Sequence, residues 1–202
     1  MNKSSKLVQG IGTKGTEYPT IESNKKLKEY ILWCNMLLRC KEKYWNRHPS
    51  YAGTTCSENF KSYSYFYRWC QEQIGFNDKS EKGRSWCLDK DLLVKGNKAY
   101  SENTCVFIPH RVNCLLIKQD STRGGYPIGV YWKKKNNQFC VQCADGSGSQ
   151  KYLGLFTNYS EAFKVYKDFK EKLIKSLAEE HKHQLDPRAY QALLNYQVEV
   201  TD

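Results

Sequence analysis

The chain has 202 residues, enough for one medium-sized domain or two small ones. Its 32 basic residues outnumber its 21 acidic ones, which gives a net charge of +11 and favours a partner that carries phosphate groups. No apolar segment approaches the ~20 residues that span a bilayer, and residues 1–6 lack the apolar segment of a secretory signal, so we expect no membrane partner.

The first part of the chain predicts a basic arm followed by two helices. Residues 1–22 are polar and without period, which indicates a flexible arm. A stripe of apolar residues at helical spacing predicts a helix from about Ser23 to Tyr44. A second helix is expected to begin with Ser57 as its N-cap and to end at Gly75.

Residues 88–113 predict two short strands around a Gly-Asn loop and then a helix that opens at Pro109. Acidic, amide and imidazole groups fall at the ends of these elements, where one divalent cation could be held. Asp89 and Asp91 are two residues apart on a strand and should point the same way.

A second module begins near residue 123. Three strands are predicted at Ile128–Tyr131, Gln138–Cys143 and Gln150–Phe156, with turn residues between them. A helix from about Ser160 follows, and Asp186-Pro187 caps a last short helix.

The cysteines do not indicate disulfides or zinc. Their number, nine, is odd, and the only close pair, Cys140 and Cys143, lies on a predicted strand without a second pair at matching spacing. We therefore expect reduced thiols in a cytoplasmic setting.

These elements predict an α+β fold. A helical N-terminal part leads into the ββα unit, and a three-stranded antiparallel sheet packed on a helix comes next. The predicted division is an arm (1–22), a helical region with the ββα unit (23–122), a second module (123–180) and a C-terminal helix and tail (181–202).

The ordered series from Leu88 to Asn113 resembles the ββα-metal finger of HNH endonucleases. The resemblance implies hydrolysis of DNA with one Mg²⁺ or Mn²⁺ ion. Asp89 matches the carboxylate ligand and Asn113 the ligand on the helix, while Asp91 is a possible second carboxylate ligand. Asn103 or Thr104 fills the position of the middle asparagine. Taken singly, each residue also fits a solvated strand or a helix start.

Lys90 occupies the position where the family carries its general base. Because lysine is normally protonated near pH 7, a contact to phosphate is the easier role for it. His110 lies three residues before Asn113 and is the best substitute base. His48, in the loop before the second helix, is the other candidate.

Residues 126–175 resemble the ethylene-response-factor-like (APETALA-type) DNA-binding domain, which also occurs attached to HNH nucleases of phages and mobile elements. The matching segments are Pro127–Trp132, Phe139–Val141, Lys151–Phe156 and the helix opening at Ser160. In that family the sheet face lies in the major groove of double-stranded DNA. The expected DNA-contacting residues are Arg123, Tyr131, Lys133, Lys135, Gln142 and Lys151.

Together the two resemblances imply a homing-type HNH endonuclease that acts in the cytoplasm of a bacterial or phage-infected cell. It would act as a monomer or a dimer. The alternative is a catalytically degenerate DNA-binding or interaction protein directed against host or competitor systems. Lys90 at the base position favours this alternative, whereas the joint presence of Asp89, Asp91, His110 and Asn113 favours the enzyme.

Overall fold

The structure is a computed structural model that describes residues 7–117, 125–200 and 202. It is an α+β protein that divides into two compact units, one formed by Met1–Asp78 with Leu88–Phe107 and the other by Lys79–Cys87 with Ile108–Asp202. The boundary therefore falls within the predicted ββα unit. In the described part of the chain, no helix combines the length and apolar character that crossing a membrane requires.

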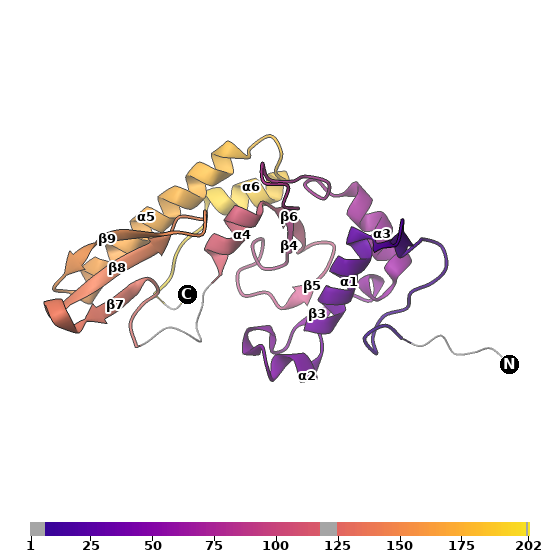
Figure 1. Cartoon of the computed structure of the whole chain (residues 1–202), viewed down its shortest axis with the longest axis horizontal. Helices are drawn as coiled ribbons and strands as arrows, with labels where there is room; N and C mark the ends of the chain where they lie inside the picture. The colour runs from indigo at the N-terminus through magenta and orange to yellow at the C-terminus, as the bar shows by residue number, and fades with distance from the viewer. Residues whose placement is uncertain (1–6, 118–124, 201) are drawn as a thin grey trace. The chain divides into compact units, whose positions relative to one another are not determined.

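The first unit is built around helices α1 (Lys28–Arg39) and α3 (Tyr63–Glu72), which pack on each other (Figure 1). Trp33 of α1 is fully buried, and its indole N–H donates to the carbonyl of Phe60 at 2.8 Å. Burial of large aromatic side chains of this kind supplies most of the stabilisation in a core. The core of this unit contains Trp33, Met36, Leu37, Phe60, Tyr63, Phe66, Trp69, Cys70, Phe76, Tyr100 and Phe107.

The remaining elements of the first unit are short. A hairpin of β1 (Ile21–Glu22) and β2 (Lys25–Lys26) precedes α1. After α1 come α2 (Glu42–Trp45), η1 (Pro49–Tyr51), β3 (Thr55–Cys56) and η2 (Asn59–Lys61), and after α3 come β4 (Cys87–Asp89), β5 (Ala99–Tyr100) and β6 (Val106–Ile108).

The two predicted N-terminal helices have different bounds in the structure. The first begins only at Lys28, because residues 21–26 form the hairpin, and it ends at Arg39. The second begins at Tyr63 with Ser62 as its N-cap, whose hydroxyl accepts from the N–H of Tyr65. Ser57 instead accepts from the N–H of Phe60 in the 3₁₀ turn that precedes α3.

The predicted flexible arm is packed from Val8 onward. Thr13 exchanges backbone hydrogen bonds with Lys61 and Tyr63, and the Tyr63 hydroxyl donates to the carbonyl of Pro19 at 2.8 Å. Gly12 lies so close to α1 that an added Cβ would stand 2.5 Å from Leu37 and from Trp33. Gly12 is therefore required at this position by the close approach to α1.

The two strands predicted on either side of the Gly-Asn loop do not pair with each other. β4 pairs with β6, whereas β5, which directly follows the loop, pairs in parallel with β3. After β4 the chain therefore runs through the Gly-Asn loop to β5, which pairs with β3, and then returns through β6 to pair with β4. Pro109 is the N-cap of α4 (His110–Leu116), whereas the sequence suggested it as the first helical residue.

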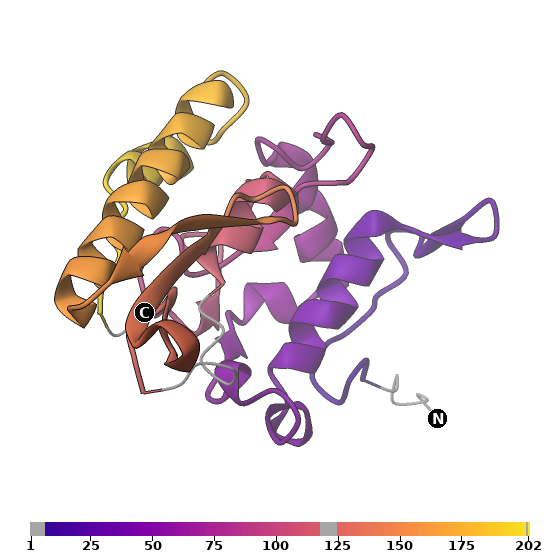
Figure 2. The same cartoon turned by 60° about the vertical axis from the view of Figure 1, so that its left-hand side comes forward.

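The second unit contains a three-stranded antiparallel sheet in the order β7-β8-β9, formed by Val130–Lys133, Gln138–Ala144 and Gln150–Phe156. The long helix α5 (Tyr159–Glu180) packs across one face of this sheet (Figure 2). α6 (Pro187–Leu194) packs on α5, and Asp186 caps it as the sequence predicted. The expected sheet packed on a helix is thus confirmed.

The core between the sheet and α5 follows the alternation of the strands. Ile128, Val130, Val141 and Cys143 point toward the helix and meet Ala162, Phe163 and Tyr166. Gly129, at a φ of +77°, lies directly against the Tyr166 ring, where no side chain would fit. This packing uses one face of the sheet and fixes which strand residues face away from the helix.

We predict that Gly12→Ala destabilises the first unit by about 1–3 kcal/mol, because the added methyl group meets Leu37, Trp33 and the Lys61 carbonyl. Urea unfolding of the variant measures this loss. The control is Gly125→Ala, where a Cβ would meet nothing within 4 Å and the stability should stay within ~0.5 kcal/mol. An unchanged midpoint for Gly12→Ala would show that residues 8–20 are not packed on α1.

Candidate functional site

Asp89 ends β4 as a buried carboxylate, with 8% of its surface exposed. Its Oδ1 accepts hydrogen bonds from the backbone N–H groups of Asp91 (3.0 Å) and Leu92 (2.7 Å). An aspartate that accepts from the backbone two residues onward stabilises a turn, which is how the chain leaves the strand here. Oδ2 is the remaining oxygen for a further ligand.

Burial raises the pKa of Asp89 to about 6, and the neighbouring Asp91 carboxylate adds to the increase. The two backbone N–H groups and the Lys90 ammonium oppose this shift. A buried carboxylate next to a second carboxylate is more stable in its ionised form when a cation lies beside it. The carboxylate chemistry therefore fits a divalent cation.

Lys90 places an ammonium group beside these carboxylates. Its Nζ lies 3.2 Å from Asp91 Oδ2 and donates to the carbonyl of Asn97 at 2.9 Å, and only 7% of the residue is exposed. The ammonium is thus used as a hydrogen-bond donor to a carboxylate and a carbonyl, which does not suit a general base.

Asn97 organises the loop that holds Lys90, a role that the sequence analysis did not assign. Its Nδ2 donates to the carbonyls of Lys90 (2.6 Å) and Ala99 (2.7 Å), while Oδ1 accepts from the N–H of Ala99. The Gly96-Asn97 pair was recognised only as a turn signal. A side chain that bonds back to its own loop is the common reason for asparagine at such positions.

The structure distinguishes the two candidates for the middle asparagine position. Asn103 is exposed, whereas the Thr104 hydroxyl hydrogen-bonds to Ser101 Oγ (2.8 Å) and donates to the carbonyl of Ala99 (2.8 Å). Thr104 is therefore the residue that is bonded into the loop.

His110 and Asn113 belong to the second unit, on α4, whereas Asp89, Lys90, Asp91 and Asn103 belong to the first. Both α4 side chains are partly exposed, and His110 Nδ1 lies 3.4 Å from Cys114 Sγ. Within the described residues, no group of three or more His, Cys, Asp or Glu side chains is arranged to hold a metal ion. Mg²⁺ commonly binds through one or two carboxylates and retains water, so Asp89 and Asp91 remain a compatible donor pair.

The sheet face opposite α5 carries polar and aromatic side chains. Tyr131 pairs with Cys140, and Gln142 pairs with Tyr152 across β8 and β9. The exposed fractions of Tyr131 and Tyr152 are 42% and 55%. A hydrogen bond with the Cys140 thiol raises the pKa of Tyr131. We call Tyr131, Gln142 and Tyr152 the open sheet face; Cys140, on the same side of the sheet, is buried.

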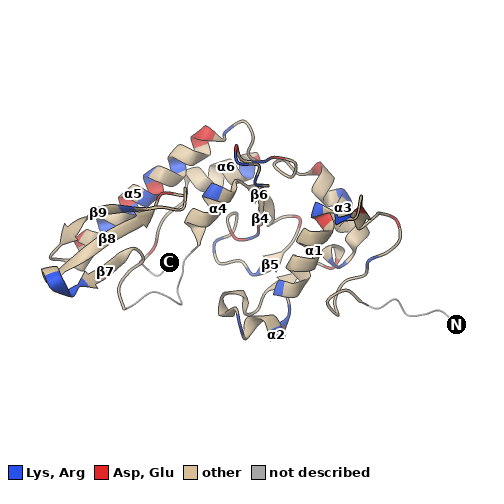
Figure 3. Ribbon diagram, viewed as in Figure 1, with Lys and Arg blue, Asp and Glu red and all other residues tan. Residues whose placement is uncertain are grey.

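Three consecutive lysines, Lys133, Lys134 and Lys135, occupy the end of β7 and the 3₁₀ turn between β7 and β8. Figure 3 shows this turn as a block of basic residues at the tip of the hairpin. The strands β7, β8 and β9 contain no acidic residue. We call Lys133, Lys134 and Lys135 the lysine turn. Together with the open sheet face it forms a surface whose strands carry no negative side chain.

One of the predicted DNA contacts, Lys151, is not part of this surface. Lys151 pairs with Cys143, whose side chain lies in the core, and its Nζ stands 5.1 Å from the ring centroid of Phe169 on α5. Its side chain therefore points to the helix side of the sheet and does not belong to the open sheet face, at whose edge the sequence placed it. A one-residue bulge in β9 follows this position, between Tyr152 and Gly154, and strand alternation alone gave no sign of it. Arg123 lies outside the described residues.

Comparison with models of known protein families, with curated proteins and with solved structures finds no match to this chain.

We predict that the stability of the protein falls as the pH rises from about 4 to about 6, because the folded state holds the proton of Asp89 more tightly than the unfolded state. The stabilisation by protonated Asp89 is complete below the pKa that Asp89 has in the unfolded chain, and it is lost as the pH rises through the pKa of Asp89 in the folded protein. Asp89→Asn keeps the Oδ1 acceptor and removes the buried charge, so it should be more stable than wild type at pH 7 by roughly 2–3 kcal/mol.

Thermal unfolding at pH 4 and pH 7 measures this difference for both proteins. Asp168→Asn, which changes an exposed carboxylate on α5, serves as the control and should follow wild type at both pH values. If Asp89→Asn also follows wild type at both pH values, Asp89 is not held in a desolvated environment.

Proposed function

We propose that the chain binds double-stranded DNA through the open sheet face and the lysine turn of the second unit. The observation that carries this proposal is the one-sided covering of the sheet. α5 buries one face, and the other presents Tyr131, Gln142 and Tyr152 beside three lysines.

The chemistry of this surface suits a nucleic acid duplex. Lysine side chains bind phosphate oxygens and position a protein on the backbone, whereas amide and hydroxyl groups bond to base edges in the major groove. Residues 126–175 carry nine basic and four acidic residues, and three of the four acidic residues lie on α5, away from the open sheet face. The resemblance to the ethylene-response-factor-like domain, which reads DNA with its sheet, supports the same assignment.

We further propose that the bound DNA is the substrate of an HNH-type endonuclease of the homing kind, in which the carboxylates of Asp89 and Asp91 hold a Mg²⁺ or Mn²⁺ ion. When bound, such an ion stabilises the charge that develops on the phosphate and promotes ionisation of a water molecule. The support is the buried carboxylate of Asp89 beside the exposed carboxylate of Asp91, together with the order of residues that resembles the HNH family.

The residues of the chain take different parts in this proposal. Asp89 offers Oδ2, since Oδ1 accepts from the backbone. Lys90, paired with Asp91, supplies a fixed positive charge that can attract a phosphate rather than accept a proton. Imidazole is the side chain most often used for proton transfer near neutral pH, and His110 is the histidine that the sequence offers for that role.

A specific observation favours the second candidate function, a DNA-binding protein without nuclease activity. The Lys90 ammonium already neutralises Asp91 and is anchored by the carbonyl of Asn97. An internal cation at this place performs part of the electrostatic role of a metal ion. In this candidate function the carboxylates and the lysine stabilise the loop, and the second unit alone engages DNA.

For binding, we predict that affinity for duplex DNA falls steeply with salt, with a log–log slope of about −4 to −7 if ~5–8 phosphates are neutralised. The triple variant Lys133→Ala, Lys134→Ala, Lys135→Ala should make this slope shallower by about 2–3 and weaken binding. Fluorescence anisotropy with a labelled duplex at several salt concentrations measures both quantities.

The matched control replaces Lys164, Lys172 and Lys175, which removes the same charge from exposed positions on α5. The salt dependence of its DNA affinity should have a log–log slope close to that of wild type. Equal effects of the two triple variants would mean that net charge alone drives binding. No binding by wild type at low salt would remove DNA as the partner.

For catalysis, we predict that Asp89→Asn reduces Mn²⁺-dependent cleavage of supercoiled plasmid by roughly 100-fold or more, because a ligand of the ion is lost. Its affinity for DNA should be unchanged. Since the same variant is expected to be more stable than wild type at pH 7, unfolding cannot explain the loss. Mn²⁺ should also raise the unfolding temperature of wild type but not of the variant.

Two outcomes would contradict the proposed chemistry. Equal cleavage by wild type and Asp89→Asn would show that the activity comes from elsewhere. Cleavage by neither, with no Mn²⁺-dependent stabilisation of wild type, would favour the DNA-binding protein without nuclease activity.

A further inference from the structure

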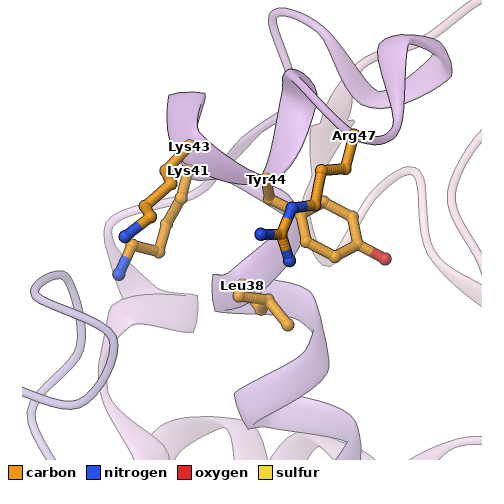
Figure 4. A pocket seen from close by; sticks show the side chains of 5 residues that line it. All are labelled: Leu38, Lys41, Lys43, Tyr44 and Arg47. Carbon is orange, nitrogen blue, oxygen red and sulfur yellow. The ribbon is translucent and has the colours of Figure 1, made fainter.

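A second basic surface lies in the first unit, at the corner between α1 and α2. A pocket of about 190 Å³ is lined there by Leu38, Lys41, Lys43, Tyr44 and Arg47. Figure 4 shows Lys41 and Lys43 extending side by side and the Arg47 guanidinium beside the Tyr44 ring. We call these five residues the corner pocket. It is smaller than the ~300 Å³ or more of a typical organic ligand site, so it suits a compact group.

The backbone explains why these cations gather. α1 ends at Arg39, and Lys41 has extended φ and ψ of −100° and 132° before α2 begins at Glu42. Residues two apart within a helix point in different directions, but Lys41 precedes the helix and so can lie parallel to Lys43. The indole N–H of Trp45 donates to the carbonyl of Arg39 at 2.8 Å and ties α2 to the end of α1.

The charges of the corner pocket are not compensated locally. Across residues 7–117, 125–200 and 202, no carboxylate pairs with Lys41, Lys43 or Arg47. Glu42 is exposed and does not line the pocket. Like charges held close together repel one another, and an anion bound between them relieves the repulsion.

The aromatic wall of the pocket is held in place. The Tyr44 ring stacks on His48 at a centroid distance of 4.2 Å and an interplanar angle of 26°, and it also meets Tyr51 at 5.7 Å. His48, considered from the sequence as a possible general base, thus packs against Tyr44. A wall fixed in this way loses little conformational freedom when a ligand binds.

We propose that the corner pocket binds a backbone phosphate of the same DNA and gives the first unit its own contact with the duplex. A phosphate carries the compact negative charge that three unpaired cations attract, and Arg47 can bind two of its oxygens at once. This inference rests on the proposed DNA binding and extends it to the first unit. A membrane surface is less suited, because the pocket offers only the partly buried Leu38 as an apolar contact.

The test is the variant Lys41→Ala, Lys43→Ala, Arg47→Ala in the full chain. By counterion release, each phosphate contact adds about 0.9 to the slope of log affinity against log salt concentration, which corresponds to about eightfold in affinity at 0.1 M salt. We expect DNA affinity to fall at least about eightfold and the slope to become shallower by about 1 or more. The matched control removes Lys25, Lys26 and Arg68, three exposed cations of the same unit outside the pocket, and should retain the affinity of wild type within about threefold.

A second measurement on unaltered protein avoids any effect of the substitutions on folding. Acetylation of lysines with and without DNA, read by mass spectrometry, should show Lys41 and Lys43 protected and Lys25 and Lys26 unprotected. Unchanged affinity in the pocket variant, or no protection of Lys41 and Lys43, would overturn the inference.

The two proposals fail in distinguishable ways. If the lysine-turn variant weakens DNA binding and the corner-pocket variant does not, only the further inference is wrong. If the corner-pocket variant alone weakens binding, the inference stands and the assignment of the sheet face is wrong. Binding to vesicles of anionic lipid through the corner pocket, without binding to DNA, would overturn both.

Discussion

Packing of α5 on one face of the β7-β8-β9 sheet is the constraint on which the proposed interface depends. Val141 and Tyr166 are buried between the two layers, and this burial fixes the direction of every strand residue. Since side chains alternate along a strand, Tyr131 and Gln142 must face away from the helix. The same core therefore stabilises the second unit and orients the residues that we assign to DNA.

A different constraint acts in the first unit, where a carboxylate pair is partly desolvated at the end of β4. Burying a charge is costly unless it is paired or hydrogen-bonded. Asp89 is held by two backbone N–H groups, and Asp91 by the Lys90 ammonium. This arrangement fits a loop that binds a divalent cation, and it also fits a loop in which the Lys90 ammonium takes the place of that cation. The lysine at the base position is what separates the two candidate functions.

Strand and helix patterns of the second unit were predictable because alternation and caps are local signals. The strands β8 and β9 and the cap at Asp186 lie within one residue of the predicted positions. Contacts far apart in the sequence were not predictable. Pairing of β5 with β3 and the packing of Gly12 on α1 both depend on partners that are distant in the sequence, while the bulge that turns Lys151 toward α5 breaks the alternation from which strand faces are predicted. The corner pocket was missed because it requires a helix break at Cys40 and Lys41 inside an apparently continuous period.

Position-specific crosslinking tests the central claim, that the open sheet face binds DNA, most directly. A photoreactive amino acid would replace Tyr152, which is 55% exposed on that face, or Lys172, which is exposed on α5. Irradiation with a labelled duplex at low salt should yield a protein–DNA adduct from position 152 and little from position 172. Adducts from position 172 but not from position 152 would place the DNA on the helix side and contradict the account.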